Sequence, residues 1–208
     1  TTSPVTREAE YVFEPEEVYA ETLHIPGLTL KAGKFKTAIG EHNSLHTHAY
    51  PFIDAPLLTT HLLGDEGMND IGVSAAGLLP LPWYSELIAQ VVSGKSEGLD
   101  YFNGPSANAT VQVGRFKNLW DLTDDLTGAL GASGANGKNA DERSTSLYGA
   151  DLTFKWRPAV QSRNHSLTWA TEWLQREQPR SSFREHSRGV ASWLQYQMAT
   201  RWWVQFRG

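Results

Sequence analysis

The sequence has no cysteine among its 208 residues, so disulfides play no part in its fold. This absence suits an exported protein without disulfides and equally a cytosolic protein, so it leaves the compartment open. The sequence also lacks any apolar run near the roughly 18 residues that a membrane-spanning helix needs. Its mean hydropathy is -0.41. A membrane β-barrel is still compatible with this value, because alternating strands dilute the apolar signal.

Basic blocks and enzyme motifs are absent as well. The net charge is -5, and no cluster of Lys and Arg could neutralise a run of phosphates, which argues against a nucleic-acid partner. There is no phosphate-binding loop and no dinucleotide fingerprint. Residues 131–135 resemble a nucleophile elbow only superficially, because a loop rather than a helix is expected after them. We therefore expect no enzyme and no catalytic residue.

What the sequence does contain is a two-residue alternation of apolar and polar side chains. From Ser146 to Leu174, two such stretches flank a turn that begins at Arg157. Successive side chains of a strand point to opposite faces, so each stretch predicts a strand with one apolar and one largely polar face. Trp residues near the ends of the apolar faces are typical of the aromatic girdles of transmembrane barrels. The expected outer, lipid-facing residues include Tyr148, Leu152, Phe154, Leu167, Trp169 and Val204.

The alternation recurs along the chain and predicts about ten antiparallel strands. The expected short turns are 26–27, 80–83, 118–125, 158–164 and 200–201, and the expected longer loops are 38–69, 94–108, 134–143 and 178–188. Outer-membrane barrels alternate short periplasmic turns with longer extracellular loops in this way. The sequence therefore predicts an all-β fold, an antiparallel transmembrane β-barrel of porin type, in one domain over residues 1–208.

This barrel is expected to be partial. A wide porin needs roughly 16–18 strands, more than the alternation supplies. Thr1 to Pro4 show neither the charged start nor the apolar core of a signal peptide, which an exported barrel requires. The strand pattern is also still running at Phe206. The sequence is therefore expected to be a fragment of a longer protein.

Several phrases of the sequence resemble a known group of membrane proteins. Residues 28–36 (LTLKAGKFK) are similar to the strand that opens the long loop of phosphate-selective-porin-like proteins. Further stretches resemble bacterial outer-membrane proteins described as hypothetical, porin-like or zinc-regulated receptor-like, namely 46–54, 64–73, 79–84, 149–158 and 201–204. The resemblance covers most of residues 14–208 and implies an outer-membrane barrel.

Charged and amide side chains opposite the apolar faces predict a water-filled interior. An isolated charge in a dry core costs several kcal/mol, and a wet lumen removes that penalty. The outer face of a soluble sandwich would be equally wet, but the Trp residues near the strand ends favour the barrel. The same alternation directs Val111 and Val113 outward. The expected pore-lining residues are Lys31, Glu86, Gln90, Gln112, Asp151, Lys155, Glu172 and Arg176.

Residues 38–69 break the alternation and form the candidate pore constriction. A structureless connection of this length is uncommon and usually functional. Its apolar residues would leave a large patch in water unless they pack against the barrel wall; they are Pro51, Phe52, Ile53, Leu57, Leu58, Leu62 and Leu63. The expected constriction residues are His42, His46, His48, Asp54 and His61.

The His residues of this loop have two interpretations. With an unperturbed pKa near 6.5, His46, His48 and His61 near a pore axis would gain charge as the pH falls, so conductance or anion preference should shift between about pH 7 and 5. Imidazole is also a zinc ligand, and the same three residues are then a candidate metal site. No other cofactor is expected.

These patterns predict a channel for passive diffusion of small hydrophilic solutes or ions across the bacterial outer membrane. Its selectivity would come from a size limit and from the field of inward side chains. The alternative is an outer-membrane receptor that binds a metal or small ligand through the His-rich loop. A third interpretation is a soluble carbohydrate-binding sandwich with Trp platforms. The expected partners are the lipid bilayer and small solutes, without nucleic acid, in a homo-oligomer such as a trimer.

Overall fold

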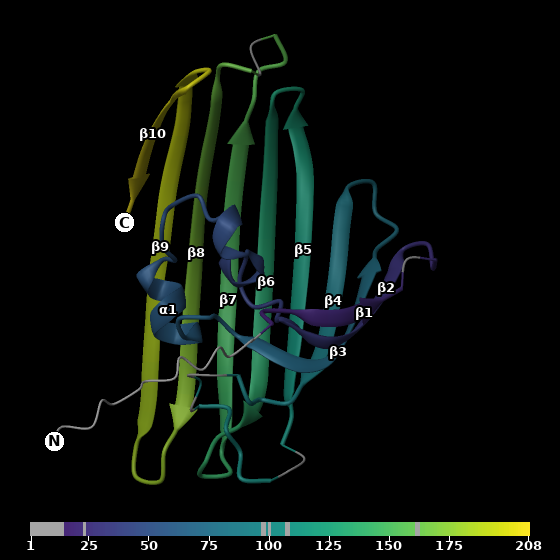
Figure 1. Cartoon of the computed structure of the whole chain (residues 1–208), viewed down its shortest axis with the longest axis vertical. Coiled ribbons are helices and arrows are strands. Elements are labelled where there is room, and N and C mark those ends of the chain that lie inside the picture. The colour runs from purple at the N-terminus through teal and green to yellow at the C-terminus, as the bar shows by residue number, and fades with distance from the viewer. Residues whose placement is uncertain (1–14, 23, 97–98, 100, 107–108, 161–162) are drawn as a thin grey trace, which may run out of the picture.

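The part of the chain that the structure describes forms one sheet of ten antiparallel strands in sequence order (Figure 1). The structure is a computed structural model that describes residues 15–22, 24–96, 99, 101–106, 109–160 and 163–208. The strands are β1 (Val18–Glu21), β2 (Leu28–Lys36), β3 (Asn69–Leu78), β4 (Tyr84–Val92), β5 (Val111–Thr123), β6 (Leu126–Lys138), β7 (Ser144–Trp156), β8 (Ser166–Pro179), β9 (Arg184–Ala199) and β10 (Trp202–Arg207). The predicted all-β, antiparallel chain of about ten strands is confirmed. Within the described residues, β1 and β10 are free edges, so the sheet is not closed into a barrel.

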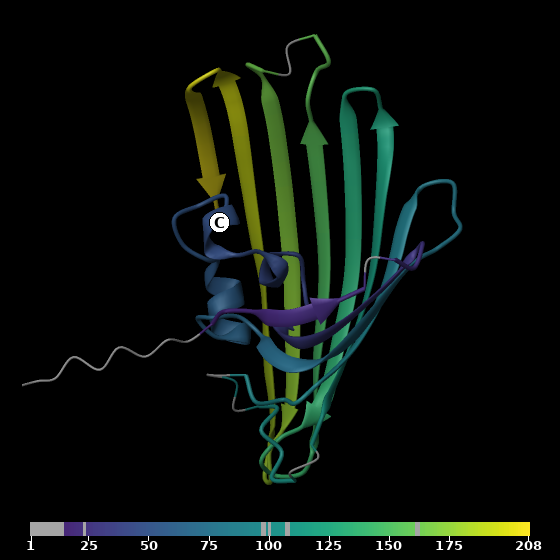
Figure 2. The same cartoon turned by 45° about the vertical axis from the view of Figure 1, so that its right-hand side comes forward.

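The sheet is strongly curved, and the curvature distinguishes its two faces. β5 to β9 are long and run side by side, whereas β1 to β3 curl over and cross in front of them (Figures 1 and 2). We call the face toward which β1 to β3 curl the inner face and the opposite one the outer face. The cross-strand register then assigns each strand residue to a face, because directly paired residues share one.

The connection from β2 to β3, residues 37–68, lies over the inner face and is called the inner segment. It contains two 3₁₀-helices, η1 (His42–Ser44) and η2 (Thr47–Ala49), and one α-helix, α1 (Leu57–Leu63). The expectation of a structureless connection is therefore wrong. A helical period explains α1: Leu58 and Leu62, one turn apart, are buried, whereas His61 is exposed. In the described part of the chain, no helix has the length and apolar character to cross a membrane.

The hydrophobic core lies on the inner face of the sheet, beneath the inner segment and described residues of the connection from β4 to β5. Its buried residues are Phe35, Ile39, Leu58, Leu62, Leu63, Met68, Val92, Leu99, Tyr101, Phe102, Val111, Val113, Ala135, Leu147, Leu174 and Ala191. Packing of Leu58, Leu62 and Leu63 agrees with the sequence-based prediction. The same prediction is wrong for Ile53 and Leu57, which are 103% and 81% exposed. Ile53 lies in the bend before α1, and Leu57 begins the helix on its solvent side.

Polar contacts fasten the inner segment at both ends of its path. Asn43 Nδ2 donates hydrogen bonds to the carbonyls of Thr37 (2.8 Å) and Met68 (3.1 Å), and its Oδ1 accepts the N–H of Met68 (2.8 Å). At the far side of the sheet, Arg207 of β10 forms an ion pair with Asp54 at 3.0 Å. The inner segment therefore crosses the inner face from β2 and β3 to β10.

Several predicted loops turn out to be strand. β5 continues through most of the expected turn 118–125, β6 through the start of the expected loop 134–143, and β8 and β9 through much of the expected loop 178–188. The stretch 134–138 is rich in Gly and Asn and the stretch 184–188 in charged residues, which hides the two-residue period there. The alternation of long and short connections consequently holds only for the first half of the sheet, because 139–143 and 180–183 are short.

Candidate functional site

The inner face carries the charged residues that the strand pattern predicted. Lys31, Gln90 and Arg176 lie in one row of paired residues that crosses the sheet from β2 to β8. The row runs through Lys31, Ser74, Gln90, Val113, Ala135, Leu147 and Arg176. Glu86 pairs with Lys117, Asp151 with Glu172, and Lys155 with Thr168. All the predicted pore-lining residues except Gln112 thus share the face that the inner segment covers.

The prediction for Gln112 is wrong, and so is the outward assignment of Val111 and Val113. Gln112 pairs with Val91 and Asn136 on the outer face and is exposed. Val111 and Val113 are buried in the core of the inner face. The sequence pattern places the even-numbered residues of β5 on the inner face, whereas the structure places the odd-numbered ones there. A shift of one residue moves every side chain of a strand to the other face.

That error of parity also concealed the central charges of the site. Arg115 and Lys117 follow Val111 and Val113 at the same two-residue spacing, so they too point inward. Arg115 Nη2 lies 2.8 Å from Glu41 Oε2 and 2.9 Å from Asp151 Oδ2. Lys117 Nζ lies 3.0 Å from Glu41. Correct parity would have identified Arg115 and Lys117 from sequence, but nothing in the sequence placed Glu41 beside them.

Glu172 holds the inner segment against β8. Its Oε2 accepts the backbone N–H of His42 at 3.1 Å. Next to it, Gly40 has a φ of 65°, and a Cβ at this position would lie 1.8 Å from Glu172 Oε1. Gly40 donates its own N–H to Ser133 Oγ on β6 at 3.0 Å. Only glycine permits this close approach, so residues 40–42 are seated directly on the strands.

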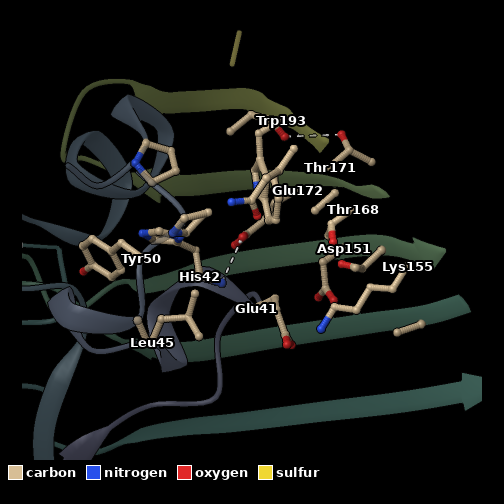
Figure 3. Close-up of a pocket in the computed structure, with 18 of the residues that line it drawn as sticks. Glu41, His42, Leu45, Tyr50, Asp151, Lys155, Thr168, Thr171, Glu172 and Trp193 are labelled. Atoms are coloured by element: carbon tan, nitrogen blue, oxygen red, sulfur yellow. Dashed lines mark hydrogen bonds between the residues drawn. The ribbon is translucent and has the colours of Figure 1, made fainter. Parts of the chain in front are cut away.

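Between the inner segment and β5 to β9 lies a cavity of about 520 Å³ (Figure 3). The inner segment contributes Glu41, His42, Leu45 and Tyr50, and the strands contribute charged, hydroxyl and amide groups together with Trp193. The strand residues of the lining include Lys117, Asp151, Thr153, Lys155, Thr168, Glu172, Trp193 and Gln195. The volume and the mixture of aromatic walls with a few polar groups suit a small polar solute.

The five residues of the predicted constriction lie in different environments. His42 is buried, its ring centroid lies 4.5 Å from that of Tyr50, and burial together with the charges of Lys36 and Arg207 lowers its pKa to about 4. His48 and His61 are exposed, and Asp54 is paired with Arg207. Of these five, only His42 lines the cavity.

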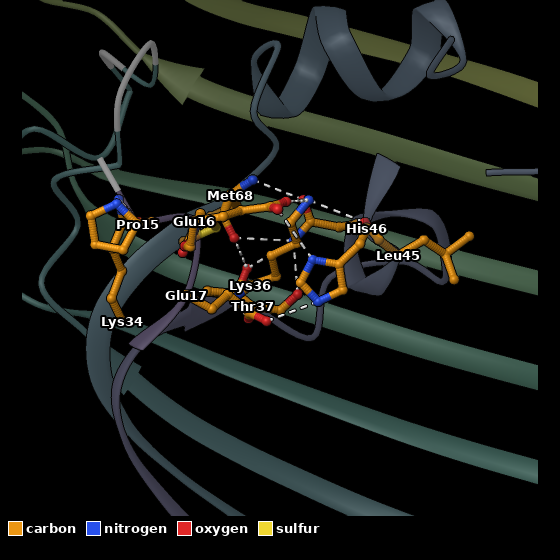
Figure 4. A network of polar contacts seen from close by, with 11 residues as sticks. Pro15, Glu16, Glu17, Lys34, Lys36, Thr37, Leu45, His46 and Met68 are labelled. Atoms are coloured by element: carbon orange, nitrogen blue, oxygen red, sulfur yellow. Dashed lines mark hydrogen bonds and ion pairs between the residues drawn. The ribbon is translucent and has the colours of Figure 1, made fainter. Parts of the chain in front are cut away.

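His46 belongs to a separate polar network at the start of the sheet (Figure 4). Its Nε2 lies 3.0 Å from Glu17 Oε2, and its Nδ1 lies 3.4 Å from Glu16 Oε2. Lys36 Nζ lies 2.9 Å from Glu16 and donates to the carbonyl of Leu45 at 3.1 Å. The hydrogen bond from Lys36 is the main reason that the pKa of Glu16 is lowered. This network connects the residues before β1 to the inner segment.

The candidate zinc ligands do not come together. The rings of His46 and His48 are stacked with centroids 5.6 Å apart, but His61 lies on α1. Among the residues that the structure describes, no three or more His, Cys, Asp and Glu side chains are grouped so that they could hold a metal ion. A pH-dependent conductance through His46, His48 and His61 stays a prediction.

Comparison with known proteins shows similarity to a bacterial protein. A protein of Aquifex aeolicus (strain VF5), described only as uncharacterized, is 31% identical in an alignment 194 residues long, and the alignment covers 83% of this chain and 40% of that protein. The chain thus matches less than half of this relative's length. No protein-family model and no solved structure matches the chain.

Proposed function

We propose that these strands form part of a porin-like channel in the bacterial outer membrane, through which small hydrophilic solutes or ions diffuse passively. The single observation that carries the proposal is the contrast between the two faces of one sheet. Exposed apolar side chains line the outer face, whereas the inner face holds charged residues beneath the inner segment. No chemical step is involved.

The outer face supports contact with a lipid bilayer. Its exposed large apolar residues include Ile71, Val73, Leu87, Val91, Phe116, Leu130, Tyr148, Trp169, Val190, Met198 and Phe206. The predicted lipid-facing residues Leu152, Phe154, Leu167 and Val204 belong to the same face by register. Soluble proteins seldom expose so extended an apolar surface. Among the described residues there is a single sheet, so nothing corresponds to the second layer of a carbohydrate-binding sandwich.

The inner segment supports a constriction. It is fastened to β2, β3 and β10 and seated on β6 and β8 through Gly40 and His42, so it occupies the middle of the inner face. In a closed barrel the inner face would surround water, and the inner segment would narrow the passage. Selectivity would then depend on the charges beside it, namely Glu41, Lys117, Asp151, Lys155 and Glu172.

A channel also requires a closed wall. Among the described residues, the edges of β1 and β10 have no neighbouring strand, and a bilayer would not tolerate such unpaired edges. We propose that further strands close the sheet, and that the closed barrels assemble as homo-oligomers such as trimers. Denaturing and native electrophoresis of the full-length protein in detergent would measure the oligomer.

The proposal is tested with the full-length protein in liposomes. Swelling in an isotonic solution of arabinose, a neutral solute, should be faster than in protein-free liposomes. A variant that lacks residues 41–63, bridged by a short Gly-Ser linker, should swell faster still, because the constriction is removed. A protein that remains monodisperse in water without detergent, and that produces no swelling, would contradict the membrane channel.

A further inference from the structure

The cavity under the inner segment has one carboxylate without a cationic partner. Glu172 is 9% exposed, and its Oε1 has no hydrogen-bond partner among the described residues. The neighbouring cations are already engaged: Arg115 with Glu41 and Asp151, and Lys117 with Glu41. A buried carboxylate in this position is an attractive partner for an ammonium group of a solute. Tyr50 and Trp193 line the same cavity and offer aromatic faces to a cation.

A cation without a carboxylate partner lines another part of the same cavity. Lys155 is exposed and forms no ion pair or hydrogen bond with any residue that the structure describes. Lys155 pairs with Thr168, four positions before Glu172 on β8. The two backbone sites are therefore roughly 13 Å apart along the strand, at about 3.3 Å per residue. Figure 3 shows the Lys155 side chain reaching back along β7 toward Asp151, which shortens the gap between the charged groups.

We propose that this cavity binds a short zwitterionic solute of the size of a di- or tripeptide, with its ammonium group at Glu172 and its carboxylate at Lys155. This inference rests on the proposed function, because it names the solute class of the constriction. An extended tripeptide spans roughly 10 Å, comparable with the separation of the two partners. Thr153, Thr168 and Gln195 line the space between them and can hydrogen-bond the peptide amides.

The balance of charge favours a zwitterion over a simple ion. The site contains three carboxylates and three cations, namely Glu41, Asp151, Glu172, Arg115, Lys117 and Lys155. A simple anion drawn to Lys155 would leave Glu172 without a partner, and a simple cation drawn to Glu172 would do the same to Lys155. One molecule that carries both charges satisfies both residues.

The test measures binding of triglycine to the full-length protein in detergent by isothermal titration calorimetry. Triglycine should bind at least about tenfold more tightly than glycine, whose charges are too close to bridge the site. Glu172→Gln retains an acceptor for the His42 N–H but loses the charge, and it should weaken triglycine binding by about tenfold. Lys155→Gln should weaken it by roughly fivefold, because Lys155 is exposed. Glu142→Gln and Lys138→Gln, which remove one charge each outside the cavity, should leave binding unchanged.

Two blocked peptides test which residue binds the ammonium end of the peptide and which binds its carboxylate end. N-acetyl-triglycine lacks the ammonium and should not respond to Glu172→Gln, whereas triglycine amide lacks the carboxylate and should not respond to Lys155→Gln. Equal losses for all three peptides, or no preference of triglycine over glycine, would overturn the site.

The arabinose swelling assay distinguishes failure of the proposed binding site from failure of the proposed channel. Swelling without triglycine binding would overturn the site and leave the channel. Triglycine binding without swelling would support the site and overturn the channel.

Discussion

The two faces of this sheet have opposite relations to solvent. On the outer face, large apolar residues such as Leu87, Tyr148 and Trp169 are exposed, whereas on the inner face Arg115 and Asp151 are buried. In a soluble protein the apolar face would be covered and the charged face would be open to water. The difference shows that the inner face is organised by the inner segment, and it is the basis for the proposal that the outer face contacts lipid. The following experiments test this contrast.

Removal of the central cation of the inner face should have the largest effect. Arg115→Met leaves Asp151 and Glu41 without their closest cation, and unfolding in urea should show a loss of roughly 3–5 kcal/mol. The double variant Arg115→Met, Asp151→Leu should recover most of this loss, because the buried carboxylate that Arg115 neutralises is removed together with it. Equal stability of the single and double variants would show that the ion pair does not organise the inner face.

A charge introduced on alternate residues of β7 compares the faces directly. Leu152→Arg, on the outer face, should destabilise the protein in lipid vesicles by about 2–4 kcal/mol if the position lies at mid-membrane. Thr153→Arg, on the inner face beside the cavity, should cost far less. Denaturant titration of both variants in the same vesicles makes the measurement. A larger loss for Thr153→Arg would reverse the assignment of the two faces.

The buried imidazole of the inner segment should make the fold sensitive to acid. The pKa of His42 is lowered from 6.5 to about 4, so the unfolded state binds a proton that the folded state does not. Its stabilising contribution is complete above about pH 6.5 and decreases as the pH falls toward 4, by at most about 3 kcal/mol. His42→Gln should flatten this part of the stability profile. Parallel acid profiles of the two proteins would show that His42 is not the responsible group.

The inner segment lies directly on the strands because Gly40 has no side chain. Gly40→Ala places a Cβ against Glu172 in a left-handed backbone conformation, and a loss of about 1–3 kcal/mol is expected. Gly114→Ala on β5 is the matched control, since a Cβ there meets nothing within 4 Å. Similar thermal unfolding of both variants would mean that residues 40–42 are not held tightly on the strands.

The smallest effect is expected from three imidazoles outside the cavity, the half-buried His46 and the exposed His48 and His61. Combined replacement of His46, His48 and His61 by Ala removes surface contacts worth less than about 1 kcal/mol each. Single-channel recording between pH 7 and 5 is the sensitive measurement, because protonation would add positive charge near the passage. Identical pH profiles of the variant and the parent would remove these residues from the constriction. Unchanged zinc affinity of the variant would remove them from any metal site.

The strand alternation alone was sufficient to predict the class of fold and most of the two faces. Periodicity is a local property, so it placed Leu152 and Phe154 on one face and Asp151 and Lys155 on the other without any knowledge of neighbouring strands. It failed where the local signal is weak. Around Gln112 a misjudged parity exchanged the two faces, and in 134–138 small and polar residues concealed the end of β6.

The candidate site itself was decided by tertiary structure. Glu41, His42 and Tyr50 meet Arg115, Glu172 and Trp193 only because the inner segment folds across strands that lie far away in the sequence. The helical period of residues 57–63 could be seen in the sequence, but not the surface against which α1 packs. Sequence patterns determine which side chains share a strand face, since that depends on neighbouring residues. Long-range packing determines which of those side chains are buried, paired or left without a partner.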